Sequence, residues 1–271
     1  MDIVTKHFIP EEVKFFLDQY VNELQEVISN ERLVGVYVYG SLALAAFHPE
    51  SSDIDFVTVT KEAVSEAEKV KIRELHKRLC THDLGKRMDG MYVPLAHVGK
   101  QNHEMSPYLY CSEGKINEGH WDINSVTWWT IKNYGITVLG QTADELPYVV
   151  TWDDVVSTMK YNVEQYWSEK VKRPYLFLST EWVEFAVVTM GRIMCTLEME
   201  RIVSKDEGLQ YMMNSCKEWE QLLQEVYWIR QNEGLKPSLS RWRRAQMTKQ
   251  YLLFSVKQCR GKWNEVKSYM P

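Results

Sequence analysis

Two nearby segments decide the fold: residues 33–41, LVGVYVYGS, and, after eleven intervening residues, residues 53–56, DIDF. The first segment is rich in β-branched and aromatic residues, which predicts a buried strand that ends at its Gly-Ser pair. Residues 42–47 predict a short apolar helix, and residues 54–59 predict a second strand. The order is therefore strand, Gly-Ser turn, short helix, and a strand that opens on two aspartates.

The Gly-Ser pair is suited to bind phosphate. Gly40 has no side chain, so a ligand can approach its backbone closely. At the mouth of a helix, free backbone N–H groups and the Ser41 hydroxyl can receive phosphate oxygens.

The two aspartates are suited to bind a metal ion. Asp53 and Asp55 are two residues apart, so on a strand they point to the same face, while Ile54 and Phe56 face the core. Two adjacent carboxylates repel each other unless a positive charge lies between them. Mg²⁺ takes one or two carboxylates and completes its shell with water and substrate phosphates. A lone Asp-x-Asp usually marks a turn or a strand end, but its combination with the Gly-Ser turn predicts a magnesium site.

The periodicity of hydrophobic residues divides the rest of the chain into two parts. Up to about residue 150, strands alternate with helices, and from residue 152 onward only helical periodicity remains. In the first part we predict helices at 10–29, 61–80 and 124–134 and strands at 88–95 and 136–139, and we leave 100–119 unassigned. In the second part we predict helices at 153–167, 180–201, 204–213, 217–232 and 241–262.

Composition narrows the class of protein. The 271 residues are 45% hydrophobic, which excludes general disorder. No apolar run is long enough for a membrane span and no signal peptide is evident, so we expect a cytoplasmic protein with no membrane partner. Five cysteines without a CxxC spacing argue against a disulfide framework or a zinc site. The net charge of -5 argues against nucleic acid as a partner and suits a small cationic substrate.

The combination of motifs resembles the signature of the nucleotidyltransferase superfamily. The chain also looks like the aminoglycoside adenylyltransferases that modify streptomycin and spectinomycin, over most of their length. Four segments carry this resemblance: 39–41 with 52–55, 88–92, 133–140, and 188–192 with 202–206.

The resemblance implies an α+β fold. Residues 1–150 would form a nucleotidyltransferase domain with a mixed sheet and flanking helices. Residues 151–271 would form a helical bundle domain that contacts the substrate and closes over the nucleotide. The implied enzyme is a Mg²⁺-dependent adenylyltransferase, which moves AMP from ATP to a hydroxyl of an aminoglycoside-like acceptor and releases pyrophosphate.

The resemblance also implies a role for individual residues. Asp53 and Asp55 would hold Mg²⁺, and Gly40 and Ser41 would bind the β- and γ-phosphates. Asp89 would be the general base for the attacking hydroxyl and a further metal ligand. From the helical half, Arg192 and Lys205 would reach the triphosphate across a cleft between the domains.

Three departures leave the acceptor open. The family more often has Glu where this chain has Asp89, and the gap between Ser41 and Asp53 is a residue longer than expected. The family's drug-recognition residues do not align cleanly, and Glu181, Trp182 and Glu184 are the nearest candidates for acceptor contacts.

Two other functions also stay open: a nucleotidyltransferase that modifies a protein side chain, and a nucleotide-binding module without turnover. The long helical half argues against the first, and the presence of the acidic residues argues against the second. The sequence does not decide the acceptor, the nucleotide, the oligomeric state or a role in drug resistance.

Overall fold

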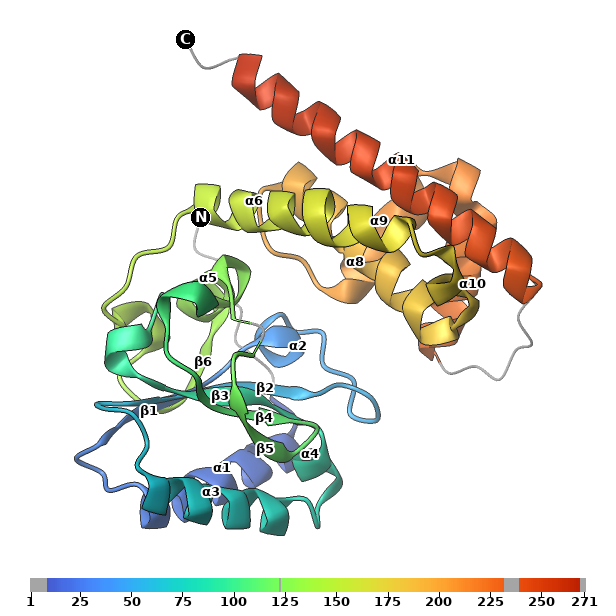
Figure 1. Ribbon diagram of the computed structural model, residues 1–271. Helices are drawn as coiled ribbons and strands as arrows, with labels where there is room; N and C mark the ends of the chain where they lie inside the picture. Colours follow the sequence, from blue (N-terminus) through green and yellow to red (C-terminus); the bar gives the residue numbers. More distant parts are fainter. Residues whose placement is uncertain (1–8, 122, 232–238, 269–271) are drawn as a thin grey trace. The chain divides into compact units, whose positions relative to one another are not determined.

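The computed structural model describes residues 9–121, 123–231 and 239–268 (Figure 1). The chain divides into two compact units, Met1–Val155 and Val156–Pro271, called unit 1 and unit 2 here. Within the described ranges, each helix is too short or too polar to cross a bilayer.

Unit 1 is built on a six-stranded mixed sheet with the strand order β5-β4-β3-β2-β1-β6. The strands are β1 (Leu33–Val38), β2 (Ile54–Thr60), β3 (Met88–Pro94), β4 (Tyr108–Ser112), β5 (Lys115–Gly119) and β6 (Ile136–Gly140). Strands β2 and β3 run parallel, and the other neighbouring pairs are antiparallel. The predicted mixed sheet is therefore confirmed.

Each face of the sheet is covered by its own apolar core. Helices α1 (Glu11–Val27) and α3 (Glu66–Leu79) lie side by side on one face (Figure 1). Helix α5 (Ser125–Tyr134) covers the other. Ile54 and Phe56 belong to the core under α1 and α3, as predicted, while Val57 belongs to the core under α5. This division follows from the alternation of side chains along a strand.

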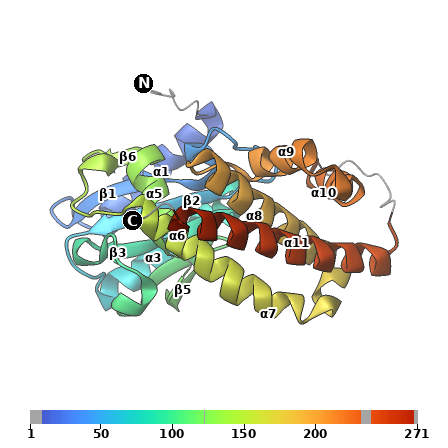
Figure 2. The same cartoon turned by 90° about the horizontal axis from the view of Figure 1, so that it is seen from above.

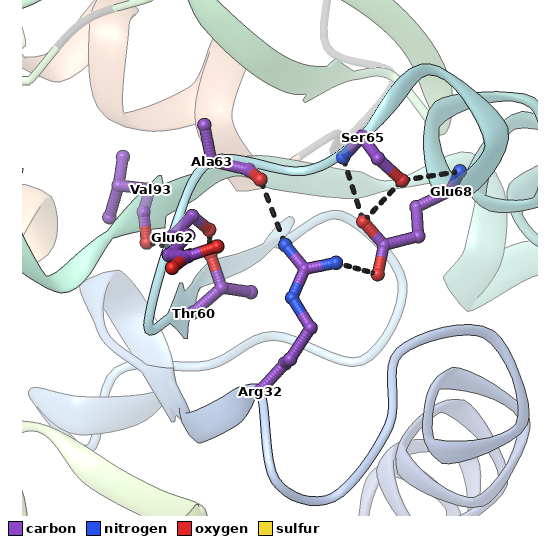
Figure 3. A network of polar contacts seen from close by, with 7 residues as sticks. All are labelled: Arg32, Thr60, Glu62, Ala63, Ser65, Glu68 and Val93. Carbon is purple, nitrogen blue, oxygen red and sulfur yellow. Dashed lines mark hydrogen bonds and ion pairs between the residues drawn. The ribbon is translucent and has the colours of Figure 1, made fainter.

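Helix α3 begins later than the predicted residue 61. Ser65 caps it, because the Ser65 side chain accepts from the Glu68 N–H and the Glu68 carboxylate accepts from the Ser65 N–H at 2.7 Å. The guanidinium of Arg32 binds both the Glu68 carboxylate and, at 2.9 Å, the carbonyl of Ala63 (Figure 3). These contacts hold the loop between β2 and α3 in a bend and stop the helix from extending backwards.

The short helix after β1 is also different from its prediction. Helix α2 spans Gly40–Ala43 instead of residues 42–47. It cannot continue, because Ala45 adopts a left-handed conformation with φ of 53°. A second four-residue helix, α4 (Asp83–Lys86), leads into β3.

The segment 100–119, which the sequence left unassigned, forms the β4–β5 hairpin. Glu113 and Gly114 make the two-residue turn, with φ of 50° and 73°. Positive φ at both central positions is typical of the turns that match the twist of a hairpin. Short 3₁₀ helices complete unit 1: η1 (Leu95–His97), η2 (Asn102–Glu104) and η3 (Ala143–Glu145).

Unit 2 is helical, and no strand occurs in its described part. Its helices are α6 (Trp152–Tyr161, which begins in unit 1), α7 (Ser168–Val171), α8 (Thr180–Met199), α9 (Lys205–Ser215), α10 (Glu220–Gln231) and α11 (Arg241–Ser268). A π-helical turn, η4 (Asn162–Trp167), joins α6 to α7, and η5 (Pro174–Leu178) and η6 (Lys217–Trp219) are 3₁₀ helices. The predicted helix 217–232 is thus split in two, and Asn232 lies outside the described residues.

Helix α8 is the centre of unit 2 and packs against α9, α10 and α11 (Figure 2). A buried ion pair joins these helices: Arg244 on α11 and Glu225 on α10 meet at 3.0 Å, with side chains 2% and 1% exposed. The other Glu225 oxygen accepts from the Leu239 N–H, and Arg244 also donates to the Thr180 hydroxyl. A buried charge must be paired in this way to be tolerated.

Candidate active site

Three aspartates lie at one end of the sheet of unit 1. Asp53 directly precedes β2, Asp55 is the second residue of β2, and Asp89 is the second residue of β3. The parallel register of β2 and β3 places Asp55 directly opposite Asp89. Both aspartates alternate with residues of the α1/α3 core, so they point to the face that α5 covers.

The Gly-Ser turn lies against Asp55. Gly40 has φ of +64°, and a Cβ atom at this position would lie 1.8 Å from Oδ2 of Asp55. No other residue therefore fits here, both for backbone conformation and for space. The N–H of Tyr39 donates to the Asp55 carbonyl at 2.9 Å, which ties the end of β1 to the start of β2.

The hydroxyl of Ser41 is the second feature of this turn. Its Oγ is buried and has no hydrogen-bond partner among the described residues. A buried polar atom in this state costs free energy, which an incoming acceptor such as a phosphate oxygen recovers. Gly40, Ser41 and Asp55, which the sequence singled out, are thus brought together as one feature.

The β4–β5 hairpin orients Asp89. The backbone N–H of Glu113 donates to Oδ1 of Asp89 at 2.7 Å. Glu113 reaches this place because it takes the left-handed conformation of the hairpin turn, which Gly114 continues. The sequence prediction did not include Glu113. A Glu-Gly pair directly after the mostly apolar segment 108–112 was the signal that could have revealed the turn.

The environment raises the pKa of Asp89 to about 6. Burial is the main cause, and the negative charges of Asp53 and Glu113 act in the same direction, while the Glu113 N–H opposes them. A carboxylate with a pKa near 6 is ionised at neutral pH and is a stronger base than an exposed one.

The residues of this site suit a metal ion that is coordinated partly by the phosphates of its substrate. Among residues 9–121, 123–231 and 239–268, no group of three or more His, Cys, Asp or Glu side chains is arranged to hold a metal. Asp53, Asp55 and Asp89 therefore do not form a ready-made three-carboxylate cage. Mg²⁺ is commonly bound by one or two carboxylates together with substrate phosphates. Asp53 and Asp55 suit that mode, because Asp55 packs against Gly40 of the Gly-Ser turn.

An aromatic pair borders this acidic face. Tyr110 on β4 is the cross-strand partner of Met91, so it shares the face of Asp89. Its ring stacks on Trp121, with centroids 5.0 Å apart and an interplanar angle of 12°. The Trp121 N–H donates to the Tyr108 hydroxyl at 2.8 Å, which anchors the residue. No periodic pattern marked Trp121, because it follows the hairpin in an irregular segment.

The remaining predicted site residues belong to unit 2. Glu181, Trp182, Glu184 and Arg192 lie on α8, and Lys205 is the first residue of α9. The Nε of Arg192 donates to the Val203 carbonyl at 2.7 Å, which ties α8 to the segment before α9. Lys205 is exposed.

The three predicted acceptor contacts have different surroundings. Glu184 forms an ion pair with Arg230 at 2.7 Å. Glu181 is exposed and hydrogen-bonds the Ser179 hydroxyl at the start of α8. The Trp182 ring lies 4.9 Å from the Lys170 ammonium group, within the range of a cation–π interaction.

Comparison with known proteins agrees with the predicted class. Residues 17–90, from α1 to β3, match the family described as nucleotidyltransferase domain. The spectinomycin 9-adenylyltransferase of Campylobacter jejuni is 24% identical over 217 residues, which cover 72% of this chain and 78% of that protein. The crystal structure of spectinomycin adenyltransferase AAD(9) from Enterococcus faecialis with ATP and spectinomycin matches with a TM-score of 0.61 and 17% identity. The match covers 90% of this chain and 99% of that one.

The chain therefore contains a nucleotidyltransferase domain that includes Gly40, Ser41, Asp53, Asp55 and Asp89. Over most of its length the chain is similar in sequence to one spectinomycin adenylyltransferase, and it shares the fold of another. The predicted resemblance is confirmed at this level.

Proposed function

We propose that the protein transfers AMP from ATP to a hydroxyl group of a small cationic acceptor and releases pyrophosphate. The observation that carries this proposal is the Gly40–Ser41 turn. The Ser41 hydroxyl is buried and has no partner in the described part of the chain, and Gly40 packs on Asp55, which lies opposite Asp89. The related structure with ATP and spectinomycin supports the choice of nucleotide and of acceptor class.

The chain supplies the phosphate contacts through its own groups. The Ser41 hydroxyl would donate to an oxygen of the β- or γ-phosphate, and Gly40 would allow the triphosphate to approach the backbone. Asp53 and Asp55 would hold Mg²⁺, which would neutralise negative charge on the triphosphate when bound. Arg192 and Lys205 are the proposed phosphate contacts from unit 2.

Asp89 is the proposed general base. Its Oδ1 is held by the Glu113 N–H, which leaves Oδ2 to accept the proton of the attacking hydroxyl. Its pKa of about 6 suits a base that must be ionised at neutral pH. A second role as a metal ligand is compatible with this position, as in sites where one carboxylate serves both purposes.

The acceptor contacts are proposed from aromatic and acidic side chains. Tyr110 and Trp121 offer a stacked surface on the face of Asp89. From unit 2, Glu181, Trp182 and Glu184 remain the proposed contacts, and Trp182 already lies against one ammonium group, that of Lys170. Carboxylates and aromatic faces attract cations, which favours an amino sugar over a neutral sugar.

The test is pyrophosphate release from ATP in the presence of Mg²⁺ and a panel of hydroxyl acceptors that includes spectinomycin and streptomycin. We expect release with at least one acceptor, and loss of release in Asp53→Asn. Asp83→Asn, an exposed aspartate paired with Lys86, is the matched control and is expected to retain activity. Saturable ATP binding without release would instead support a nucleotide-binding module.

A further inference from the structure

Most side chains of the loop before Asp53, residues 48–52, are exposed and do not pack into an apolar core. His48, Pro49, Glu50 and Ser51 are all exposed. The loop is closed on itself, because the N–H groups of residues 51 and 52 donate to the His48 carbonyl at 3.1 and 2.9 Å. These bonds fix the shape of the loop, but they do not attach it to the sheet.

Arg87 makes that attachment. Its Nη2 donates to the Pro49 carbonyl at 2.7 Å, and its Nη1 donates to the Ser52 carbonyl. Its own backbone carbonyl accepts from the Ile54 N–H at 2.8 Å. One residue therefore contacts the chain on both sides of Asp53.

Arg87 also directly precedes β3, two residues before Asp89. Its contacts therefore connect the segment that carries Asp53 to the strand that carries Asp89. Two carboxylates in proximity repel each other, and the one on the less anchored segment would move away first. A guanidinium is suited to prevent this, because its planar fork can donate to two carbonyls at once.

We propose that Arg87 is a positioning residue of the nucleotide and metal site, which holds Asp53 beside Asp89 through the loop of residues 48–52. This inference rests on the proposed function, since it assumes that Asp53 binds the metal. It assigns no contact between Arg87 and the nucleotide. Its effect is expected on metal affinity and turnover and not on the binding of the acceptor.

Arg32 offers a matched control at the other end of β2. It too holds a loop through a backbone carbonyl, that of Ala63, and it adds an ion pair with Glu68 (Figure 3). Arg32→Met therefore removes the same kind of contact from the same sheet, away from the aspartates. This variant therefore measures how the loss of arginine contacts to a loop affects stability when the aspartates are not involved.

The experiment compares Arg87→Met, Arg87→Lys and Arg32→Met with the unmodified full chain. Affinity for Mn²⁺ is measured by electron paramagnetic resonance in the presence of a non-hydrolysable ATP analogue. The turnover number, the KM for the acceptor and the thermal midpoint are measured on the same preparations.

We expect Arg87→Met to weaken Mn²⁺ binding roughly 10-fold or more and to lower kcat by about 10- to 100-fold, as other supporting residues of metal sites do. The KM for the acceptor should stay within about twofold, since the acceptor contacts are not touched. Arg87→Lys should recover part of the loss, because an ammonium group can reach one carbonyl but not both. Arg32→Met should lower the thermal midpoint while its Mn²⁺ affinity stays unchanged.

Unchanged Mn²⁺ affinity in a folded Arg87→Met would overturn the inference and leave the proposed function standing. An equal loss of Mn²⁺ affinity in Arg32→Met would also overturn it, because the effect would then be one of general stability. If Arg87→Met does not fold, Arg87→Lys decides in the same way. A wild-type protein that binds Mn²⁺ and nucleotide but releases no pyrophosphate contradicts the proposed function, and the Mn²⁺ comparison still tests Arg87.

Discussion

The two ends of strand β2 differ in how some of their polar groups are paired. At the end where β2 leads to α3, the polar groups drawn in Figure 3 pair with one another: Arg32 with Glu68 and Ala63, Ser65 with Glu68, and Thr60 with Glu62. At the end that begins with Asp53, carboxylates face each other across strands and the buried Ser41 hydroxyl has no partner among the described residues. Satisfied polar groups stabilise a fold, whereas unsatisfied ones are retained where a ligand will complete them.

The comparison predicts the largest effect at Gly40. Gly40→Ala would force φ of +64° on a residue with a side chain and place its Cβ 1.8 Å from Asp55 Oδ2. We expect kcat to fall by roughly 10³-fold, because displacement of a catalytic group by about 1 Å already costs about 10², together with a loss of about 1–3 kcal/mol in stability. Pyrophosphate release and urea unfolding measure the two quantities.

Gly261→Ala is the matched control for this substitution. Gly261 lies in α11, and a Cβ there meets nothing within 4 Å. Alanine should therefore preserve activity and stabilise the helix by about 0.5–1 kcal/mol. Equal activity of the two variants would show that the close approach of Gly40 to Asp55 is irrelevant to turnover.

The next largest effect is expected at the hairpin turn. Glu113→Pro removes the N–H that donates to Asp89 and cannot adopt φ of 50°. We expect kcat to fall by about 10²-fold, the usual cost of a misplaced catalytic group. Glu113→Asn keeps the N–H and tolerates the left-handed conformation, so it should stay within a few-fold of wild type. Similar rates for the two variants would contradict a role for the turn in orienting Asp89.

A smaller effect concerns the core between the two ends. His76 is buried and donates to or accepts from the Tyr92 hydroxyl at 2.8 Å, and burial lowers the pKa of His76 to about 3. In the unfolded chain the pKa of histidine is about 6.5, so the unfolded state binds more protons between these values and stability falls as the pH falls below 6.5. The loss from this residue is about 1.4 kcal/mol per pH unit, or roughly 2 kcal/mol at pH 5.

Urea unfolding at pH 5 to 7 checks this expectation. His76→Gln keeps a neutral polar group and has no proton to gain, so its stability should depend less on pH in this range. Tyr92 and Cys111, which contact His76, have a pKa raised by burial and stay neutral here. Parallel curves for the variant and the wild type would exclude His76 as the source of the acid sensitivity.

The smallest effect is expected at the paired end of β2. Burial acts to raise the pKa of Glu68, but hydrogen bonds from Ser65 and Arg32 outweigh it and keep this pKa below its usual value. Glu68→Gln should cost about 1 kcal/mol at neutral pH, the usual value of one such interaction. Because the folded-state pKa is the lower one, this difference should shrink as the pH falls below about 4.5. Pyrophosphate release should be unchanged, and a loss of activity equal to that of Glu113→Pro would remove the distinction between the two ends.

Local patterns account for most of what could be predicted. The strand before Gly40, the alternation around Asp55 and the long helical periods of unit 2 are all short-range properties of the chain, and the corresponding elements occur within a few residues of their predicted bounds. Two helix bounds were predicted wrongly, because intrinsic helix propensity does not account for the local conformations that set them. Helix α3 starts late because Ser65 caps it, and α2 ends early at the left-handed Ala45.

The sequence by itself determined the class of the protein: a strand, a Gly-Ser turn and two aspartates on one strand face, all within about twenty residues whose geometry follows from backbone periods. Only the tertiary structure decided how the site is held. The Glu113 N–H reaches Asp89 across 24 residues, and Arg87 reaches Ser52 and Pro49 across 35 and 38. Such contacts depend on which strands pair and in what register, and no local pattern encodes them.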